Sequence, residues 1–226
     1  MTMRASETPA IRMTGVVKTF GAVVANRDAF LDVATGEIHA LVGENGAGKS
    51  TLLSLGATAL MPKSGKVSLN ELDSRDQQTQ FRKRVAWMPQ QYRAVPGLTV
   101  REQVAYSGWL KGMSRDDSWR GASEALARVA LQDLADRPAS ELSGGQQQRV
   151  AVARALASKP KFILADEPTA NLDSTATNQL LDIMEQLNKE EHITFIFATH
   201  DQRVMDKARR VVSLDDGKVI SDVVKS

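Results

Sequence analysis

The chain has no cysteine, which excludes disulfide bonds, thiolate zinc sites and cysteine nucleophiles and is compatible with a reducing cytosol. Lys plus Arg (29) exceed Asp plus Glu (27) by only two, so the charge balance argues against nucleic acid as the main partner. No stretch reaches the roughly 18 uncharged apolar residues of a transmembrane helix. The N-terminal MTMRASETPAIRM lacks the apolar core of a secretory signal. We therefore expect a protein that does not itself span the membrane.

Apolar runs and turn signals alternate along the chain, as in proteins whose strands are interleaved with helices. The apolar fraction of 42% and the charged fraction of 25% are those of an ordinary globular protein. The pattern predicts helices over 144–157 and 174–189, and an inserted helical lobe from 98 to about 138. It predicts strands over residues 11–17, 29–33, 38–42, 161–165 and 193–198.

The segment GENGAGKS, residues 43–50, fits the phosphate-loop pattern G-x-x-x-x-G-K-[ST] between a predicted strand and a helix-like run. Its glycines allow consecutive N–H groups to converge on phosphate at a helix N-terminus. Lys49 would contact the β and γ phosphates, the Ser50 hydroxyl would ligate Mg²⁺, and Thr51 would contact the α phosphate. A chance match in this length has a probability of roughly one per cent. A plain glycine turn is therefore the weaker explanation.

An apolar strand in KFILADEP, residues 161–168, ends in two adjacent acids. A solvated turn would explain such acids on their own, but a phosphate loop upstream supplies a magnesium ion for them to serve. Asp166 would then hold the metal, and Glu167 would polarise the attacking water.

The segment LSGGQQQR, residues 142–149, places a serine and two glycines before a helical run. Ser143 as a helix N-cap explains the serine. The glycines lower helix propensity, which suggests that backbone approaches another group closely at a second anion site. Two such sites cannot easily reach one nucleotide, so two copies arranged head to tail would each supply the half that the other lacks.

Five motifs in this order and spacing resemble the ATPase domain of ABC transporters across nearly the whole chain: GENGAGKS, LSGGQQQR, LADEP, ANLD and TH at 199–200. LSGGQ is highly specific to that family. The resemblance implies an α/β fold: a P-loop NTPase core with a parallel sheet, an N-terminal antiparallel β subdomain and an inserted α-helical subdomain. It implies a single ABC ATPase domain over 1–226, with 1–97 and 142–226 as its core and 98–141 as the helical subdomain.

The same resemblance implies ATP and Mg²⁺ as cofactors and gives each motif residue a role. Catalysis would rest on Glu167, His200 and Lys49, and Mg²⁺ would be held by Ser50, Gln90 and Asp166. The ATP of the chain itself would contact Phe20, Gly43, Asn45, Gly46, Ala47, Gly48, Lys49, Ser50, Thr51 and Gln90. The ATP of the partner copy would contact Ser143, Gly144, Gly145, Gln146 and Asp173.

Several of these roles have plainer alternatives. Phe20, expected to stack on adenine, could be a core residue. Gln91 could replace Gln90, although the preceding Met-Pro favours Gln90. Asp173 could be only a helix cap. His39 and His192 are expected to be structural, and Thr58 and Ala59 depart from the family at a helix exit that touches no nucleotide.

The resemblance implies a cytoplasmic protein at the inner face of the membrane that forms a dimer, usually of identical subunits, and drives a separate permease. Membrane contact would run only through the permease, which the helical lobe and the Gln90 loop would touch. From Leu142 onward the sequence is similar to lipoprotein-releasing and macrolide-exporter ATPases, whereas PGLTVREQVAYSGWLKGM resembles ABC-2 type exporters and GEIHALVGENGAGKSTLL resembles sugar importers. Export is favoured over import. The alternative is a non-transport ABC ATPase of iron–sulfur assembly or cell division.

Overall fold

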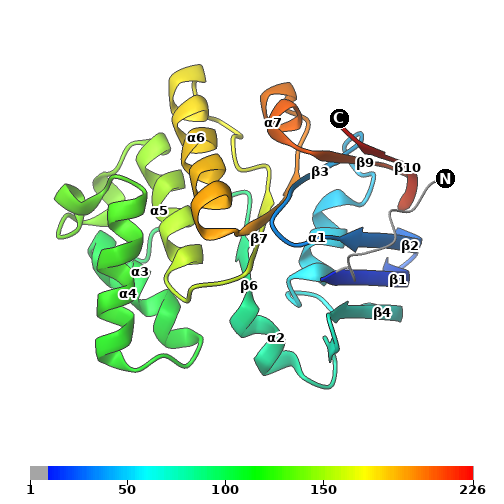
Figure 1. Ribbon diagram of the computed structural model, residues 1–226, viewed down its shortest axis with the longest axis horizontal. Coiled ribbons are helices and arrows are strands. Elements are labelled where there is room, and N and C mark those ends of the chain that lie inside the picture. The colour runs from blue at the N-terminus through cyan, green and yellow to red at the C-terminus, as the bar shows by residue number, and fades with distance from the viewer. Residues whose placement is uncertain (1–9, 226) are drawn as a thin grey trace.

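The computed structural model describes residues 10–225, so most of the N-terminal segment used above to argue against a leader lies outside it. The chain forms two β-sheets with helices between and beside them (Figure 1). No helix of residues 10–225 has the length and apolar character needed to cross a bilayer.

The larger sheet has six strands in the order β10-β9-β3-β8-β7-β6. Strands β9, β3, β8, β7 and β6 run parallel, and β10 pairs antiparallel with β9 at one edge. Helices cover both faces, so β7 and β8 are buried at every position and read as continuous apolar runs. The strands are β3 (Ile38–Val42), β6 (Val85–Met88), β7 (Phe162–Asp166), β8 (Thr194–Ala198), β9 (Arg210–Asp215) and β10 (Lys218–Val224).

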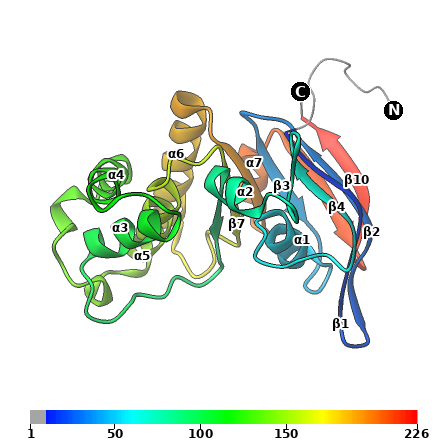
Figure 2. The ribbon, with the colours of Figure 1, turned by 90° about the horizontal axis from the view of Figure 1, so that it is seen from below.

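The smaller sheet is antiparallel, with strands in the order β2-β1-β4-β5. Its strands are β1 (Ile11–Phe20), β2 (Val23–Val33), β4 (Ser64–Leu69) and β5 (Leu72–Asp73). Helix α1 (Lys49–Gly56) lies between the two sheets, where its buried leucines share one apolar core with both (Figure 2). The fold class predicted from the sequence is therefore confirmed.

The segment after β6 is helical, as its spacing predicts. It contains α3 (Val100–Leu110), α4 (Arg115–Arg128) and the 3-10 turns η1 (Gln132–Leu134) and η2 (Ala139–Glu141). Helices α3 and α4 pack on each other and on α5 (Gly144–Leu156), and all three contribute to a second apolar core. The remaining helices are α2 (Gln78–Arg84), α6 (Ser174–Glu191) and α7 (Gln202–Lys207).

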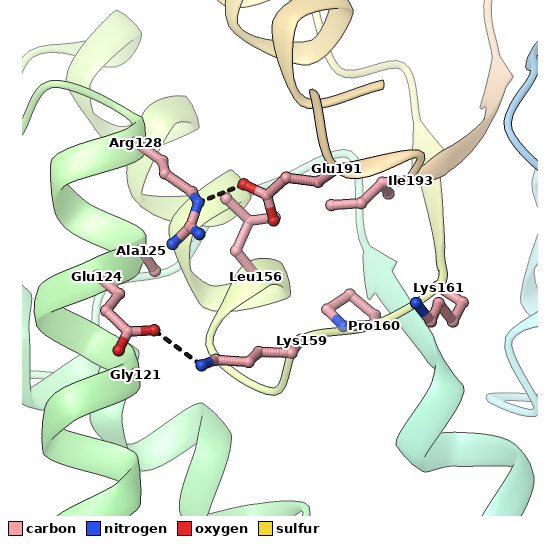
Figure 3. A pocket seen from close by; sticks show the side chains of 10 residues that line it. All are labelled: Gly121, Glu124, Ala125, Arg128, Leu156, Lys159, Pro160, Lys161, Glu191 and Ile193. Atoms are coloured by element: carbon pink, nitrogen blue, oxygen red, sulfur yellow. Dashed lines mark hydrogen bonds and ion pairs between the residues drawn. The ribbon is translucent and has the colours of Figure 1, made fainter. Parts of the chain in front are cut away.

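Helix α4 contacts the segment that connects α5 to β7. A Cβ on Gly121 would lie 2.8 Å from the Ala157 carbonyl oxygen, so only glycine permits this approach. Beside it, Glu124 pairs with Lys159 at 2.9 Å and Arg128 pairs with Glu191. The two ion pairs flank a cavity of about 140 Å³ (Figure 3).

Predicted and observed element boundaries agree closely. Strand β3 has the expected bounds, β7 and β8 each begin one residue later than expected, and β1 and β2 are longer. His39 is fully buried on β3, and His192 ends α6 in a left-handed conformation, as expected of structural residues. Thr58, just beyond α1, adopts φ of 56°, where glycine is the easier residue. The Arg82 guanidinium donates to both its hydroxyl and its carbonyl at 2.8 Å.

Candidate active site

Four predicted site segments meet at one edge of the large sheet. The P-loop follows β3, the acids end β7, His200 follows β8, and Gln90 lies two residues after β6. These four strands are parallel and adjacent, so their carboxyl ends share one edge. That edge is where open α/β sheets bind ligands.

The P-loop has the backbone conformation that its glycines allow. Gly46 and Gly48 have φ of 86° and 93°, and Gly48 is the N-cap of α1. A Cβ on Gly43 would lie 2.3 Å from the Leu214 carbonyl oxygen, so the loop passes directly against β9. The buried Lys49 ammonium donates to the carbonyls of Gly43 at 2.7 Å and Glu44 at 3.0 Å.

Ser50 and Asp166 meet although 116 residues separate them. The Ser50 hydroxyl, in the first turn of α1, donates to Asp166 Oδ1 at 2.8 Å. Asp166 is 8% exposed. Burial raises the pKa of Asp166 above its ordinary value, and the neighbouring Glu167 acts in the same direction, while Ser50 and Lys49 oppose both. A buried carboxylate in this position is stabilised by a cation.

Glu167 and His200 form a second pair directly beside the first. Glu167 Oε1 lies 2.9 Å from His200 Nδ1. Glu167 is buried and holds φ of 45°, a conformation that costs a non-glycine residue about 1–3 kcal/mol and is typical of functional sites. Its N–H donates to the Ala198 carbonyl at 2.8 Å, which fixes it against β8. The His200 side chain is 71% exposed and so remains accessible from outside the chain.

The other predicted nucleotide residues make no side-chain hydrogen bond to these pairs within residues 10–225. Phe20, at the end of β1, is 49% exposed, so it is not the core phenylalanine of the plainer alternative. Lys18 Nζ lies 5.3 Å from its ring centroid. Gln90 and Gln91 are both exposed. Of the remaining P-loop residues, Asn45 is exposed, Ala47 is buried and Thr51 is half-buried.

The predicted residues of the second anion site lie at the N-terminus of α5. Ser143 and Gln146 form a reciprocal cap: Ser143 N–H donates to Gln146 Oε1 at 3.0 Å, and Gln146 N–H donates to Ser143 Oγ at 3.4 Å. Within residues 10–225, no side chain of 143–146 bonds to the P-loop. A Cβ on Gly145 would lie 3.0 Å from Ala176 Cβ of α6, so packing within the chain already favours this glycine. Gly144 is exposed, with only Leu172 Cδ2 at 4.0 Å.

Asp173 caps α6, because its Oδ1 accepts from the Ala176 N–H at 2.8 Å. The structure therefore confirms the helix cap that the sequence offered as the plainer role of Asp173. A hydrogen bond that the sequence did not reveal joins the segment between β7 and α6 to the residue after His200. Thr169 Oγ1 donates to Asp201 Oδ2 at 3.0 Å.

The sequence also gave no sign of the residues that support the P-loop from behind. The buried Asn26 side chain of β2 donates to the Gly48 carbonyl at 3.2 Å, and Gly217, in the β9–β10 turn, donates its N–H to the Ala47 carbonyl at 3.1 Å. These contacts join three segments that are distant in sequence. No local pattern could have shown them.

Comparison with known proteins places this arrangement in a family. The family described as "ABC transporter" matches residues 27–170. The lipoprotein-releasing system ATP-binding protein LolD 1 of Caulobacter vibrioides is 40% identical over 199 residues, covering 85% of each chain. The ABC transporter ATP-binding protein YtrE of Bacillus subtilis is 40% identical over 196 residues, covering 84% of this chain and 85% of the relative.

Solved structures agree with the sequence comparisons. The dimeric structure of a bacterial ABC transporter cassette superposes with a TM-score of 0.83 at 33% identity, covering 95% of this chain and 98% of the cassette. The same cassette is known as a dimer in a post-hydrolysis state bound to ADP and Pi. This chain therefore belongs to the ABC transporter family, as an ATP-binding and ATP-hydrolysing subunit.

Proposed function

We propose that this sheet edge hydrolyses ATP to ADP and phosphate by in-line attack of water, and that two copies of the chain share two such sites. The observation that carries the proposal is the convergence of the P-loop, the Ser50–Asp166 pair and the Glu167–His200 pair at one edge. Glu167 accepts the proton of the attacking water, His200 holds Glu167 and reaches the γ phosphate, and Lys49 stabilises the charge that develops on it.

The residues present fit a magnesium ion. A serine hydroxyl and a carboxylate are hard oxygen ligands of the kind that Mg²⁺ prefers, and here they are already within hydrogen-bond distance. Ser50, Asp166 and Gln90 would hold the ion. When bound, Mg²⁺ neutralises charge on the transferred phosphate.

The residues at the N-terminus of α5, whose side chains make no hydrogen bond to the P-loop within residues 10–225, support a shared site in a dimer. Gly144 is open, Ser143 and the α5 N-terminus are exposed, and a helix N-terminus binds anions. We propose that Ser143, Gly144, Gly145 and Gln146 contact the γ phosphate held by the partner copy, and that Asp173 links the two sites. The dimeric relative supports the pairing of two copies.

We propose a separate permease as the partner, driven through the helical lobe. The chain would divide into a core over 1–97 and 142–226 and a lobe over 98–141. A groove of about 130 Å³ lies where the two meet, between β6, the segment after it, α3 and α5. Lys111 and Arg154 line this groove, and burial lowers the pKa of Lys111 to about 8. A cytoplasmic segment of the permease that carries an acidic side chain would fit there.

The lipoprotein-releasing ATPase is matched over most of its length, so we propose an export-type system of that mechanical class, shared with macrolide exporters. In it, the chain would lie in the cytoplasm at the inner face of the membrane, held there by the permease. ATP would close the dimer and move the lobes, and hydrolysis would reopen it, since ATP binds the closed state more strongly.

The test is light scattering of purified Glu167→Gln with and without Mg-ATP, beside an ATPase assay of the unmodified chain. We expect the variant to dimerise only with Mg-ATP and to lose hydrolysis. Hydrolysis at the unmodified rate would show that Glu167 is not the base. An inactive variant that stays monomeric at saturating Mg-ATP would contradict the shared site.

A further inference from the structure

We infer that Asn26 is a positioning residue for phosphate binding: by holding the Gly48 carbonyl from behind the P-loop, it aims the Lys49 N–H at the nucleotide. The inference rests on the proposed ATP site. It assigns a role to a residue of the antiparallel sheet, outside every motif described above.

The amide of Asn26 bonds to a carbonyl at the start of α1. Asn26 lies on β2, is fully buried, and donates from Nδ2 to Gly48 O at 3.2 Å. The same carbonyl accepts the Leu52 N–H at 2.9 Å, the first bond of the helix. Two donors therefore fix the direction of the Gly48 carbonyl.

The peptide geometry carries that constraint to the opposite side of the loop. In a planar trans peptide, the carbonyl of one residue and the N–H of the next point in opposite directions. Holding the Gly48 carbonyl toward β2 thus turns the Lys49 N–H away from β2. Likewise, the Gly217 N–H holds the Ala47 carbonyl at 3.1 Å, which turns the Gly48 N–H away. Both N–H groups lie at the helix start, where they have no acceptor within the helix and are available to phosphate.

The approach is too close for any side chain on the loop. A Cβ on Gly48 would lie 2.3 Å from the Ala25 carbonyl oxygen and 2.8 Å from Asn26 Nδ2. A Cβ on Gly217 would lie 2.7 Å from the same Ala25 oxygen and 2.9 Å from Asn26 Cα. The Gly217 carbonyl in turn accepts the Arg27 N–H at 2.9 Å. The backbones of the P-loop, β2 and the β9–β10 turn therefore pack directly against one another.

A purely structural role does not explain an asparagine at this position. No described residue donates to Asn26 Oδ1, which is buried. A buried polar atom without a partner destabilises the fold, so an apolar side chain of the same size would suit packing better. Asn26 also follows Phe20 on the β1–β2 hairpin, so a single hairpin would carry both the adenine contact and the phosphate-loop support.

The test compares Asn26→Leu with the unmodified chain in Mg-ADP and Mg-ATP binding by titration calorimetry, in ATPase kinetics and in thermal melting. Loss of one neutral hydrogen bond should weaken the binding of Mg-ADP and of Mg-ATP about three- to tenfold and should raise KM for ATP by a similar factor. The kcat should change less than about twofold. The Tm should be equal or higher, because the unpartnered oxygen is removed. Asn26→Asp, which turns a carboxylate oxygen toward the Gly48 carbonyl, should weaken binding further.

Ser158→Ala is the matched control, because Ser158 Oγ is also buried with no partner among residues 10–225 but lies after α5, away from the P-loop. It should change melting without changing nucleotide affinity. Wild-type affinity and KM in Asn26→Leu would overturn the role of Asn26 while leaving the ATPase proposal standing. Absence of Mg-ADP and Mg-ATP binding by the unmodified chain would overturn both.

Discussion

His39 should make the folded chain sensitive to mild acid. Its side chain is fully buried on β3, and burial, assisted by Arg210, lowers its pKa from the ordinary 6.5 to about 4. The pKa of His39 is lower in the folded chain than in the unfolded chain, so below about pH 6.5 the unfolded chain binds a proton that the folded chain does not. The free energy of unfolding therefore falls as the pH drops from about 6.5 toward about 4. One pKa unit corresponds to about 1.4 kcal/mol, so the full loss is about 3 kcal/mol, of which about 2 kcal/mol is lost by pH 5.

Groups that face His39 act in both directions. Glu37 Oε2 lies 3.4 Å from His39 Nε2, and a carboxylate at that distance favours the protonated ring, as does Asp222. The backbone of Ala34 also favours the protonated ring, but burial is the largest effect and outweighs all three. The value of about 3 kcal/mol is thus an upper bound.

The measurement is urea denaturation at pH 7.5 and pH 5.0 of the unmodified chain and of His39→Leu, which keeps a similar volume and cannot be protonated. The free energy of unfolding of the unmodified chain should fall by about 2 kcal/mol more than that of the variant. Equal losses in the two proteins would refute the reasoning, because the acid sensitivity would then come from other groups.

Three further substitutions test the packing and the electrostatics of the site. Gly48→Ala should weaken ATP binding at least about tenfold by calorimetry, because its Cβ would meet the Ala25 carbonyl at 2.3 Å; wild-type affinity would contradict the tight approach. Asp166→Asn should abolish hydrolysis and should also raise the Tm at pH 7.5. Burial raises the pKa of Asp166, so at pH values above that pKa the ionised side chain destabilises the folded state, and asparagine removes this penalty. This gain should shrink as the pH is lowered in the same melting series, and a lower Tm at pH 7.5 would count against it. Gly121→Ala should reduce the free energy of unfolding by about 1–3 kcal/mol in urea, through its clash with the Ala157 carbonyl at 2.8 Å; an unchanged midpoint would disprove that contact.

The parts of the fold that the sequence predicts are those set by local pattern. Strands β3, β7 and β8 are predominantly apolar, and α5 and α6 begin after capping residues, so their bounds were accurate to one or two residues. The common edge of the site followed from the rule that parallel strands present their carboxyl ends together.

The remainder depends on contacts between distant segments. Asn26 has no motif around it, and its role appears only when β2, the P-loop and the β9–β10 turn are seen together. The glycines of LSGGQ illustrate the same point. Sequence reasoning assigned both to an external anion, whereas the position of Gly145 is already constrained by Ala176 of α6.

The ion pairs beside Gly121 also fix the position of α4 along its own axis. Glu124 and Arg128 are one helical turn apart, and each pairs with a residue of opposite charge outside the helical lobe: Glu124 with Lys159 and Arg128 with Glu191. Sliding α4 by one turn in one direction would bring Glu124 opposite Glu191, and sliding it the other way would bring Arg128 opposite Lys159. Each exposed pair stabilises by at most about 1 kcal/mol. Because the two pairs have opposite polarity, a shift of α4 in either direction would place like charges opposite each other. The helical lobe can therefore tilt about this contact more easily than it can slide along the axis of α4.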